Sequence, residues 1–212
     1  MMKMRMRETD IIGFVEDICH MFEYQSRAKS IKFSFVHEDQ HLPVWIDLAN
    51  FDKVVVNLLS NAFKYTATGG EVVVTVSHDN KNMVLSVRDN GEGIPKDKVE
   101  KIFERFYQSD TKTNDRHLGT GIGLDLANSL VLLHHGSITA KNNEKGGGAT
   151  FTVTIPLGSA HLRDEEKVEI SENDSNEDTM SKLLEESYES VVEPEPTEQQ
   201  AILPRGKRQS IV

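Results

Sequence analysis

The amino-acid sequence predicts a two-layer α/β sandwich, an α+β fold in which helices cover one face of a mixed sheet. The first observation behind this prediction is that helical and strand patterns alternate along residues 10–155. The second is that the strand patterns come in consecutive pairs, each joined by a short turn or loop. Strands joined in this way lie side by side in antiparallel or mixed pairing, so the intervening helices must pack on a face of the sheet.

The first predicted element is a helix over residues 10–29, in which apolar side chains recur every three or four positions. Thr9 stands directly before it and is the expected N-cap, because its hydroxyl oxygen can accept a hydrogen bond from a free backbone N–H. A strand is expected next, where Ile31, Phe33 and Phe35 alternate with polar residues. A further short strand is expected over residues 44–46.

The second predicted helix begins after Asp47, whose carboxylate can cap the first turn, and carries an apolar face along residues 48–62. It ends near a Thr-Gly-Gly sequence, which favours a turn. Two strands rich in β-branched residues follow, Glu71–Ser77 and Met83–Asp89. Residues 78–82 between them form a predicted hairpin loop.

Residues 90–123 are rich in glycine and charge and show little periodicity, so they are expected to be mostly loop. A third helix is predicted from about Thr120 to His135, with Gly136 ending it. The last two predicted strands are Ser137–Lys141 and Ala149–Ile155, joined by a turn that contains three consecutive glycines.

The negative charge of the chain is concentrated beyond residue 157. The formal net charge is −10, and residues 158–212 contribute −8 of it through fourteen acidic and six basic residues. Apolar periodicity fades in this stretch, so we interpret residues 1–157 as one domain and residues 158–212 as an acidic, mostly disordered linker or tail. An acidic balance argues against nucleic acid as a partner, because a phosphate backbone is bound by Lys and Arg.

The sequence also indicates a compartment. Its apolar runs stay well short of the roughly 18 residues that span a bilayer, so no membrane contact is expected from this chain. Cys19 is the single cysteine and lies in an apolar helical pattern, which favours a small core residue over a nucleophile. A lone cysteine forms no internal disulfide, which fits a reducing compartment. We therefore expect a cytoplasmic location, with any membrane anchor of a parent protein in other segments.

Three polar residues share one face of the second predicted helix. Asn57, Asn61 and Lys64 lie three or four positions apart, so their side chains project together. Two amides and an ammonium group can hold a hydrated Mg²⁺ and phosphate oxygens, because Mg²⁺ keeps several waters and takes few protein oxygens. For this cluster alone, a polar helix face turned to solvent is the alternative.

A second polar cluster, residues 89–95 (Asp-Asn-Gly-Glu-Gly-Ile-Pro), directly follows a strand that is predicted to be buried. A carboxylate at this point can accept a hydrogen bond from the amino group of adenine, and glycines allow a base to approach the backbone. An ordinary Asp-Asn-Gly turn is the alternative.

A third cluster, residues 119–124 (Gly-Thr-Gly-Ile-Gly-Leu), opens the third predicted helix. Glycine-rich turns at a helix N-terminus present free N–H groups to phosphate. The spacing is not Gly-x-Gly-x-x-Gly and no strand precedes it, which disfavours a dinucleotide fingerprint. The motifs that accompany a protein-kinase glycine loop are also missing after it.

Together and in this order, the three clusters resemble the N, G1 and G2 boxes of the histidine-kinase branch of the GHKL ATPase superfamily. Residues 103–106 (Phe-Glu-Arg-Phe) resemble the F box of that family, which lies between G1 and G2. The resemblance covers about residues 10–157 and implies the Bergerat ATP-binding fold. The segment after residue 155 looks like the one that follows the catalytic domain in hybrid two-component sensor kinases, where a receiver domain comes next.

The resemblance implies roles for individual residues. Asn61 would bind Mg²⁺, with Asn57 and Lys64 beside the phosphates as the catalytic set. Asp89 would select adenine, and residues 95–118 would form a mobile lid over ATP. The implied ATP-binding residues are Asn57, Asn61, Lys64, Tyr65, Asp89, Gly91, Gly93, Ile94, Arg105, Gly119, Thr120, Gly121, Ile122, Gly123 and Leu124.

Asn57 separates a kinase from a hydrolase within this resemblance. The gyrase, chaperone and mismatch-repair relatives have Glu at this position, where it acts as general base on water. An amide takes no proton at neutral pH, so Asn57 favours an enzyme that keeps the γ-phosphate for a histidine. Such a transfer rests on positioning and on charge neutralisation by Mg²⁺.

The phospho-acceptor histidine of the family has no counterpart in this chain. It lies in a helical motif like His-Glu-aliphatic-basic-Thr-Pro, and none of the eight histidines here has that context. The implied function is the ATP-binding catalytic domain of a protein histidine kinase. Its implied partners are ATP, a histidine-bearing dimerisation domain outside this chain and a response-regulator receiver domain. A GHKL-type ATP hydrolase and a degenerate nucleotide-binding module stay open as alternatives, the second because Gln108 stands where many relatives carry a basic residue.

Overall fold

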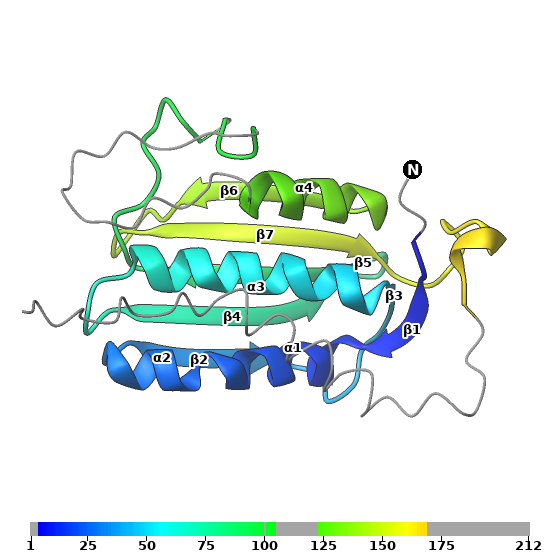
Figure 1. Cartoon of the computed structure of the whole chain (residues 1–212), viewed down its shortest axis with the longest axis horizontal. Coiled ribbons are helices and arrows are strands. Elements are labelled where there is room, and N and C mark those ends of the chain that lie inside the picture. Colours follow the sequence, from blue (N-terminus) through cyan, green and yellow to red (C-terminus); the bar gives the residue numbers. More distant parts are fainter. Residues whose placement is uncertain (1–3, 100, 105–122, 169–212) are drawn as a thin grey trace, which may run out of the picture.

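The computed structural model describes residues 4–99, 101–104 and 123–168. Its main sheet has the strand order β2-β4-β5-β7-β6, and the helices lie on one face of that sheet (Figure 1). β2 and β4 run parallel, and the other neighbouring strands run antiparallel. The predicted two-layer sandwich with a mixed sheet is thus confirmed. The strands of this sheet are β2 (Lys32–His37), β4 (Glu71–His78), β5 (Asn82–Asp89), β6 (Ser137–Asn142) and β7 (Ala149–Pro156).

α3 (Leu48–Tyr65) is the central helix of the covering layer and packs on β5. Asp47 caps it as predicted, because its side chain accepts a hydrogen bond from the backbone N–H of Asn50. Phe51 and Phe63 are fully buried; the Phe51 ring contacts Phe14 of the first helix, and the Phe63 ring contacts Phe33 of β2. Burying a side chain of this size contributes about 1.5–3 kcal/mol of hydrophobic free energy. The buried side of α3 is therefore fixed, which gives the polar residues on its other side a rigid base.

A second, two-stranded sheet lies beside the first. It pairs β1 (Arg7–Asp10) with β3 (Pro43–Ile46) in antiparallel register. The sequence predicted a strand at residues 44–46 but missed β1, because four consecutive polar residues carry no alternation of apolar and polar positions. The strand at 44–46 accordingly does not join the main sheet.

Asp10 is the N-cap of α1 (Ile11–Met21), where the sequence predicted Thr9. The Asp10 carboxylate accepts a hydrogen bond from the backbone N–H of Ile12 at 3.2 Å and another from that of Leu42 at 3.0 Å. Thr9 lies in β1, one residue too early to cap the helix. Asp10 therefore also ties the start of α1 to the segment that leads into β3.

The predicted continuous helix over residues 10–29 is two helices, because Phe22 interrupts it. Phe22 has φ −89° and ψ −4° and separates α1 from α2 (Glu23–Ala28). Its buried ring stacks on that of Phe63, with the ring centroids 5.4 Å apart. The contact anchors the break in the core, whereas α2 itself has no buried residue.

α4 (Gly123–Leu133) ends earlier than predicted, and the residue that ends it differs from the predicted one. The residue with left-handed backbone is His135, at φ +58°, rather than Gly136. The backbone N–H of Gly136 then donates to Val131 O at 3.0 Å. A Cβ at Gly136 would lie only 2.4 Å from Thr154 O. Glycine is thus required at position 136 by the close approach of β7, not by its own φ angle.

Residues 158–168, which the sequence analysis assigned to a linker, pack against the N-terminal segment. They include the 3-10 helix η1 (Asp164–Glu166). The backbone N–H of Met6 donates to Glu166 O at 2.7 Å, and that of Val168 donates to Met6 O at 2.9 Å. In the described part of the chain, no helix combines the length and apolar character that crossing a membrane requires.

Candidate functional site

The polar side of α3 forms one wall of the candidate site. Asn57, Asn61 and Lys64 are all half-buried there. The Asn57 amide is oriented by a hydrogen bond from its Nδ2 to Lys53 O at 2.7 Å, one helical turn earlier. The Lys64 ammonium lies 5.3 Å from the centroid of the Tyr65 ring, within range of a cation–π interaction.

The first residue of α4 lies directly against Asn57. A Cβ at Gly123 would come within 2.4 Å of Oδ1 of Asn57, closer than two non-bonded atoms can approach. The N-terminus of a helix carries unpaired backbone N–H groups and a partial positive charge. The fold therefore brings Asn57 of the first predicted motif together with Gly123 of the third, at the first described residue of α4.

Asp89, at the end of β5, is a buried carboxylate that is only 5% exposed. Its Oδ1 accepts hydrogen bonds from the backbone N–H groups of Gly91 at 2.9 Å and Ala149 at 3.3 Å. Burial raises the pKa of Asp89, while these two bonds and the charge of Arg88 act in the opposite direction. Within residues 4–99, 101–104 and 123–168 no donor contacts Oδ2, so one carboxylate oxygen remains for the amino group of a ligand.

The loop after Asp89 folds against the C-terminal end of α3. A Cβ at Gly91 would lie 2.1 Å from Tyr65 O, so only glycine fits there. Gly93 has φ +75°, a conformation that glycine adopts at no steric cost. The Tyr65 side chain is 46% exposed beside this loop. Burial and the charge of Glu92 raise the pKa of the Tyr65 phenol.

Two residues that the sequence analysis missed hold this loop from the other side. Asn142, at the end of β6, exchanges two hydrogen bonds with the backbone of Ile94, at 2.7 and 2.6 Å. Asn143 donates through Nδ2 to Asp89 O at 2.7 Å. The only sequence signal near them is the run of three glycines that turns β6 into β7, and it predicts a turn without indicating what the asparagines contact.

Of the remaining predicted site residues, two are described and five lie outside the described part of the chain. Ile94 and Leu124 are half-buried and pack against the main core. Of the predicted lid, residues 95–99 and 101–104 are described, and Phe103 packs edge-on against Phe151 with centroids 6.4 Å apart. The predicted site residues that lie outside the described part of the chain are Arg105, Gly119, Thr120, Gly121 and Ile122.

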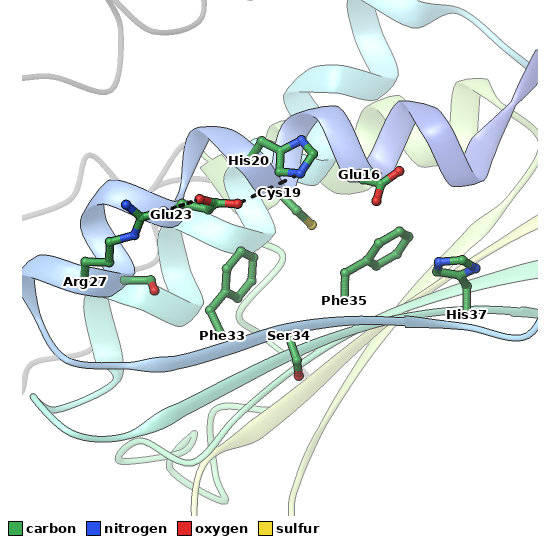
Figure 2. A pocket seen from close by; sticks show the side chains of 10 residues that line it. Glu16, Cys19, His20, Glu23, Arg27, Phe33, Ser34, Phe35 and His37 are labelled. Carbon is green, nitrogen blue, oxygen red and sulfur yellow. Dashed lines mark hydrogen bonds and ion pairs between the residues drawn. The ribbon is translucent and has the colours of Figure 1, made fainter.

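A separate groove of about 370 Å³ lies between α1, α2 and the edge strand β2 (Figure 2). Phe33 and Phe35 project from β2 toward the helices, where Cys19, His20 and Glu23 line the opposite side. Burial raises the pKa of Cys19 to about 12, so its thiol stays protonated and is a core group rather than a nucleophile. Among the predicted ATP-site residues that the structure describes, none lines this groove.

Residues 46–159 match the family described as histidine kinase-, DNA gyrase B- and HSP90-like ATPase. Among full-length proteins, the chain is similar to hybrid signal transduction histidine kinase D of Dictyostelium discoideum, with 39% identity over 145 residues. That similarity covers 66% of this chain and 9% of the relative. The chain therefore spans only a small part of the length of this relative.

Solved structures with the same architecture support this similarity. The catalytic domain of histidine kinase ThkA, in a nucleotide-free form, has a TM-score of 0.65 and 27% identity, and the match covers 73% of this chain and 99% of that domain. Full-length ShkA in complex with AMPPNP has a TM-score of 0.65 and 25% identity, over 76% of this chain and 34% of ShkA. The fold that the sequence predicted is the fold of these domains.

Proposed function

The chain belongs to the family of histidine kinase-, DNA gyrase B- and HSP90-like ATPases, and from this membership we propose that it is the ATP-binding catalytic domain of a two-component sensor histidine kinase. The domain binds Mg-ATP and supplies the γ-phosphate to a histidine on a dimerisation domain outside this chain. The observation that carries the proposal is the meeting of three motifs along α3, where Asn57 abuts Gly123 and Tyr65 abuts Gly91.

The adenine end of the proposed site is built around Asp89. Its Oδ1 is held by two backbone N–H groups, which fixes the plane of the carboxylate. An amino group is the hydrogen-bond partner that a carboxylate requires, and adenine carries one where guanine carries a carbonyl oxygen. The missing side chain at Gly91 lets the loop that follows Asp89 pack against Tyr65 O at the end of α3.

The phosphate end of the proposed site lies about two helical turns earlier. Asn57 and Tyr65 are eight residues apart on α3, or about 12 Å at a rise of 1.5 Å per residue. This separation allows a base at one end and a phosphate chain at the other. The N-terminus of α4 favours negative charge near Asn57. The Lys64 ammonium adds a positive charge farther along the same helix, beside Tyr65. Mg²⁺, when bound with ATP, would neutralise the phosphates, and Asn61 is its proposed protein ligand.

In the proposed reaction, a nitrogen of the acceptor histidine attacks the γ-phosphorus. The N–P bond forms, the bond from phosphorus to the bridging oxygen breaks, ADP leaves, and the imidazole proton passes to water. Asn57 is suited to orienting rather than to proton transfer, because its Nδ2 is already committed to Lys53 O and its amide oxygen is not basic. A water molecule therefore finds no base at Asn57, which favours transfer over hydrolysis.

Similar proteins suggest the wider setting. The Dictyostelium relative is named a hybrid signal transduction histidine kinase, which supports a parent protein with further domains. We propose that a response-regulator receiver domain is the eventual acceptor of the phosphoryl group. A cytoplasmic location, where ATP and a reducing environment are available, fits the free, buried thiol of Cys19.

Calorimetry of the full chain with ATP, in the presence and absence of Mg²⁺, tests the proposal when inorganic phosphate is assayed in the same samples. The expected result is Mg-dependent binding of ATP without release of phosphate. Sustained phosphate release would instead identify a hydrolase. Lack of binding to any adenine nucleotide would identify a degenerate module and overturn the proposal.

A further inference from the structure

Two consecutive asparagines at the end of β6 bind the main chain of the loop that carries the base-selecting carboxylate. Asn142 accepts a hydrogen bond from the Ile94 N–H through Oδ1 at 2.7 Å and donates through Nδ2 to Ile94 O at 2.6 Å. The side-chain amide thus takes the place of a neighbouring strand for one residue of the loop. Backbone polar groups that are removed from water need such partners.

The bond geometry at Asn142 depends on Gly93. A Cβ at Gly93 would lie 2.9 Å from Oδ1 of Asn142 and would crowd the oxygen that Ile94 uses. Gly93 also has φ +75°, which turns the chain so that both backbone groups of Ile94 face the asparagine. The loop conformation and the Asn142 side chain are therefore matched to each other.

Asn143 holds the other end of the same loop. Its Nδ2 donates to Asp89 O at 2.7 Å and to Gly147 O at 2.8 Å. Its Oδ1 accepts from the Thr150 hydroxyl at 2.6 Å, which fixes which end of the amide points to Asp89. A Cβ at Gly148 would lie 2.1 Å from Asp89 O, so the turn between β6 and β7 is in direct contact with the main chain of Asp89.

We infer that Asn142 and Asn143 are positioning residues for base recognition, so that the β6–β7 turn sets the preference of the site for adenine over guanine. The inference rests on the proposed function, because Asp89 is taken to accept the adenine amino group. A site built around a hydrogen bond discriminates strongly only if the acceptor is held in place. Asn143 fixes the main chain of Asp89, and Asn142 fixes the loop that supplies one of the two donors to its Oδ1.

The test compares Asn142→Asp and Asn143→Asp with Asn80→Asp in the full chain. The first change replaces the donor to Ile94 O by an acceptor, and the second does the same to Asp89 O. Asn80 lies exposed in the β4–β5 hairpin loop, so its substitution makes the same chemical change away from the loop that carries Asp89. Dissociation constants for Mg-ATP and Mg-GTP are measured by calorimetry, and thermal unfolding is followed in parallel.

We expect Asn142→Asp and Asn143→Asp to weaken ATP binding about tenfold, which corresponds to the loss of about one net hydrogen bond. GTP binding should change less, so the ratio of the dissociation constant for GTP to that for ATP falls. Asn80→Asp should leave both dissociation constants at the wild-type value. A lowered melting temperature with an unchanged ATP/GTP ratio would assign the asparagines a purely structural role and overturn the inference.

Two further variants keep the test decisive. If an Asp variant fails to fold, Asn142→Ser removes both hydrogen bonds to Ile94 without placing a carboxylate oxygen against Ile94 O. The same ratio of dissociation constants is then measured. Thr150→Val removes only the donor to Asn143 and should shift the ratio in the same direction by a smaller factor. Wild-type protein that binds no ATP would instead defeat the proposed function, an outcome distinct from wild-type binding with an unaltered ratio in the variants.

Discussion

Oδ1 of Asn57 on α3 and the main chain of Gly123 on α4 are in direct contact, since a Cβ on residue 123 would come within 2.4 Å of that oxygen. The contact joins two helices whose sequences are separated by both strands β4 and β5 and by the predicted lid. It also orients the Asn57 amide from one side, while the bond from its Nδ2 to Lys53 O orients it from the other. Position 123 is therefore as much a part of the candidate site as Asn57.

Gly123→Ala is expected to weaken ATP binding by about tenfold or more. The added methyl group must displace the Asn57 amide, and overpacking of this kind costs about 1–3 kcal/mol. Alanine is favoured over glycine within a helix by about 1 kcal/mol, so the melting temperature should fall less than the affinity. Calorimetry and thermal unfolding measure the two effects separately.

A double-mutant cycle with Asn57→Ala isolates the contact. The truncated side chain no longer meets the new methyl group, so Gly123→Ala should be less destabilising in the Asn57→Ala background than in the wild type. Strictly additive changes in the free energy of unfolding, together with unaltered ATP binding in Gly123→Ala, would contradict the assigned contact.

Asp89→Asn is expected to reverse the base preference of the site. The amide oxygen can keep the bonds from Gly91 and Ala149, while the amide nitrogen presents a donor where the carboxylate presented an acceptor. ATP affinity should fall about a hundredfold and GTP affinity should rise. Competition between the two nucleotides for one fluorescent analogue measures both, and a variant as selective as the wild type would refute the adenine role.

The same substitution has a stability consequence of defined sign. Burial raises the pKa of Asp89 above its ordinary value of 3.8, so the folded state binds this proton more readily than the unfolded state. Ionisation of Asp89 therefore lowers the free energy of unfolding. This loss of stability is complete when the pH is above the raised pKa of the folded state. Asp89→Asn should be at least as stable as the wild type at pH 7 by chemical denaturation, and a clear loss of stability would contradict this reasoning.

Asn61→Ala is expected to remove the Mg-dependent part of ATP affinity. The wild type should bind ATP more tightly with Mg²⁺ than without it, whereas the variant should bind with similar affinity in both conditions. Asn61 is half-buried on α3 and its change to alanine favours the helix, so the fold should persist. Asn80→Ala in the exposed hairpin serves as the control. An Mg²⁺ response equal to that of the wild type would refute Asn61 as the metal ligand.

The elements predicted best from the sequence are those whose pattern is local. β4, β5 and β7 alternate buried and half-buried residues along most of their length, and their β-branched and apolar residues indicated strands in the sequence. The apolar face of α3 and its Asp47 cap were predicted for the same reason. The polar and glycine-rich clusters were recognisable because packing alone does not explain them.

The features that the sequence did not predict depend on distant partners. β1 exists because its polar residues pair with β3, and Phe22 interrupts the first helix where its ring meets Phe63. Asn142 and Asn143 bond to backbone atoms about fifty residues earlier in the chain, as the separations of 48 and 54 positions show. An asparagine beside a glycine-rich turn is ordinary, so only the three-dimensional placement assigns it a role.

Glu166→Gln is expected to destabilise the packing of residues 158–168 at neutral pH but not at low pH. The Arg163 side chain is the largest cause that lowers the pKa of Glu166, to about 2, with further help from the Arg163 backbone N–H. A lowered folded-state pKa adds stability above the ordinary value of 4.5, and this stability is lost as the pH falls toward 2. The difference in melting temperature between wild type and variant should therefore shrink as the pH falls from 5 to 3.

Glu165→Gln is the matched control for this prediction. Glu165 also pairs with Arg163, at 3.1 Å, but its side chain is 66% exposed, and surface ion pairs contribute little to stability. Its substitution should change the melting temperature only slightly at any pH. Equal effects of the two substitutions on the melting temperature would show that the burial of Glu166 does not determine its contribution to stability.

His134 joins the end of α4 to the start of α3 and should make the fold sensitive to mild acid. Its Nδ1–H donates to Leu130 O at 2.7 Å and its Nε2 accepts from the backbone N–H of Asp47 at 3.1 Å, so the bonded form is the neutral imidazole. Burial lowers the pKa of His134 below 6.5. The unfolded chain therefore binds this proton at a higher pH than the folded chain, and stability is lost as the pH falls below 6.5.

His134→Gln removes this titration and should flatten the dependence of the melting temperature on pH between 7 and 5.5. The variant should be less stable than the wild type at pH 8, because it replaces a fitted ring that packs edge-on against Phe51. His20→Gln, at an exposed site on α1, should keep the wild-type pH dependence. If His134→Gln follows the same pH curve as the wild type, the coupling of α3 to α4 does not depend on the charge of this histidine, and the acid sensitivity must come from other groups.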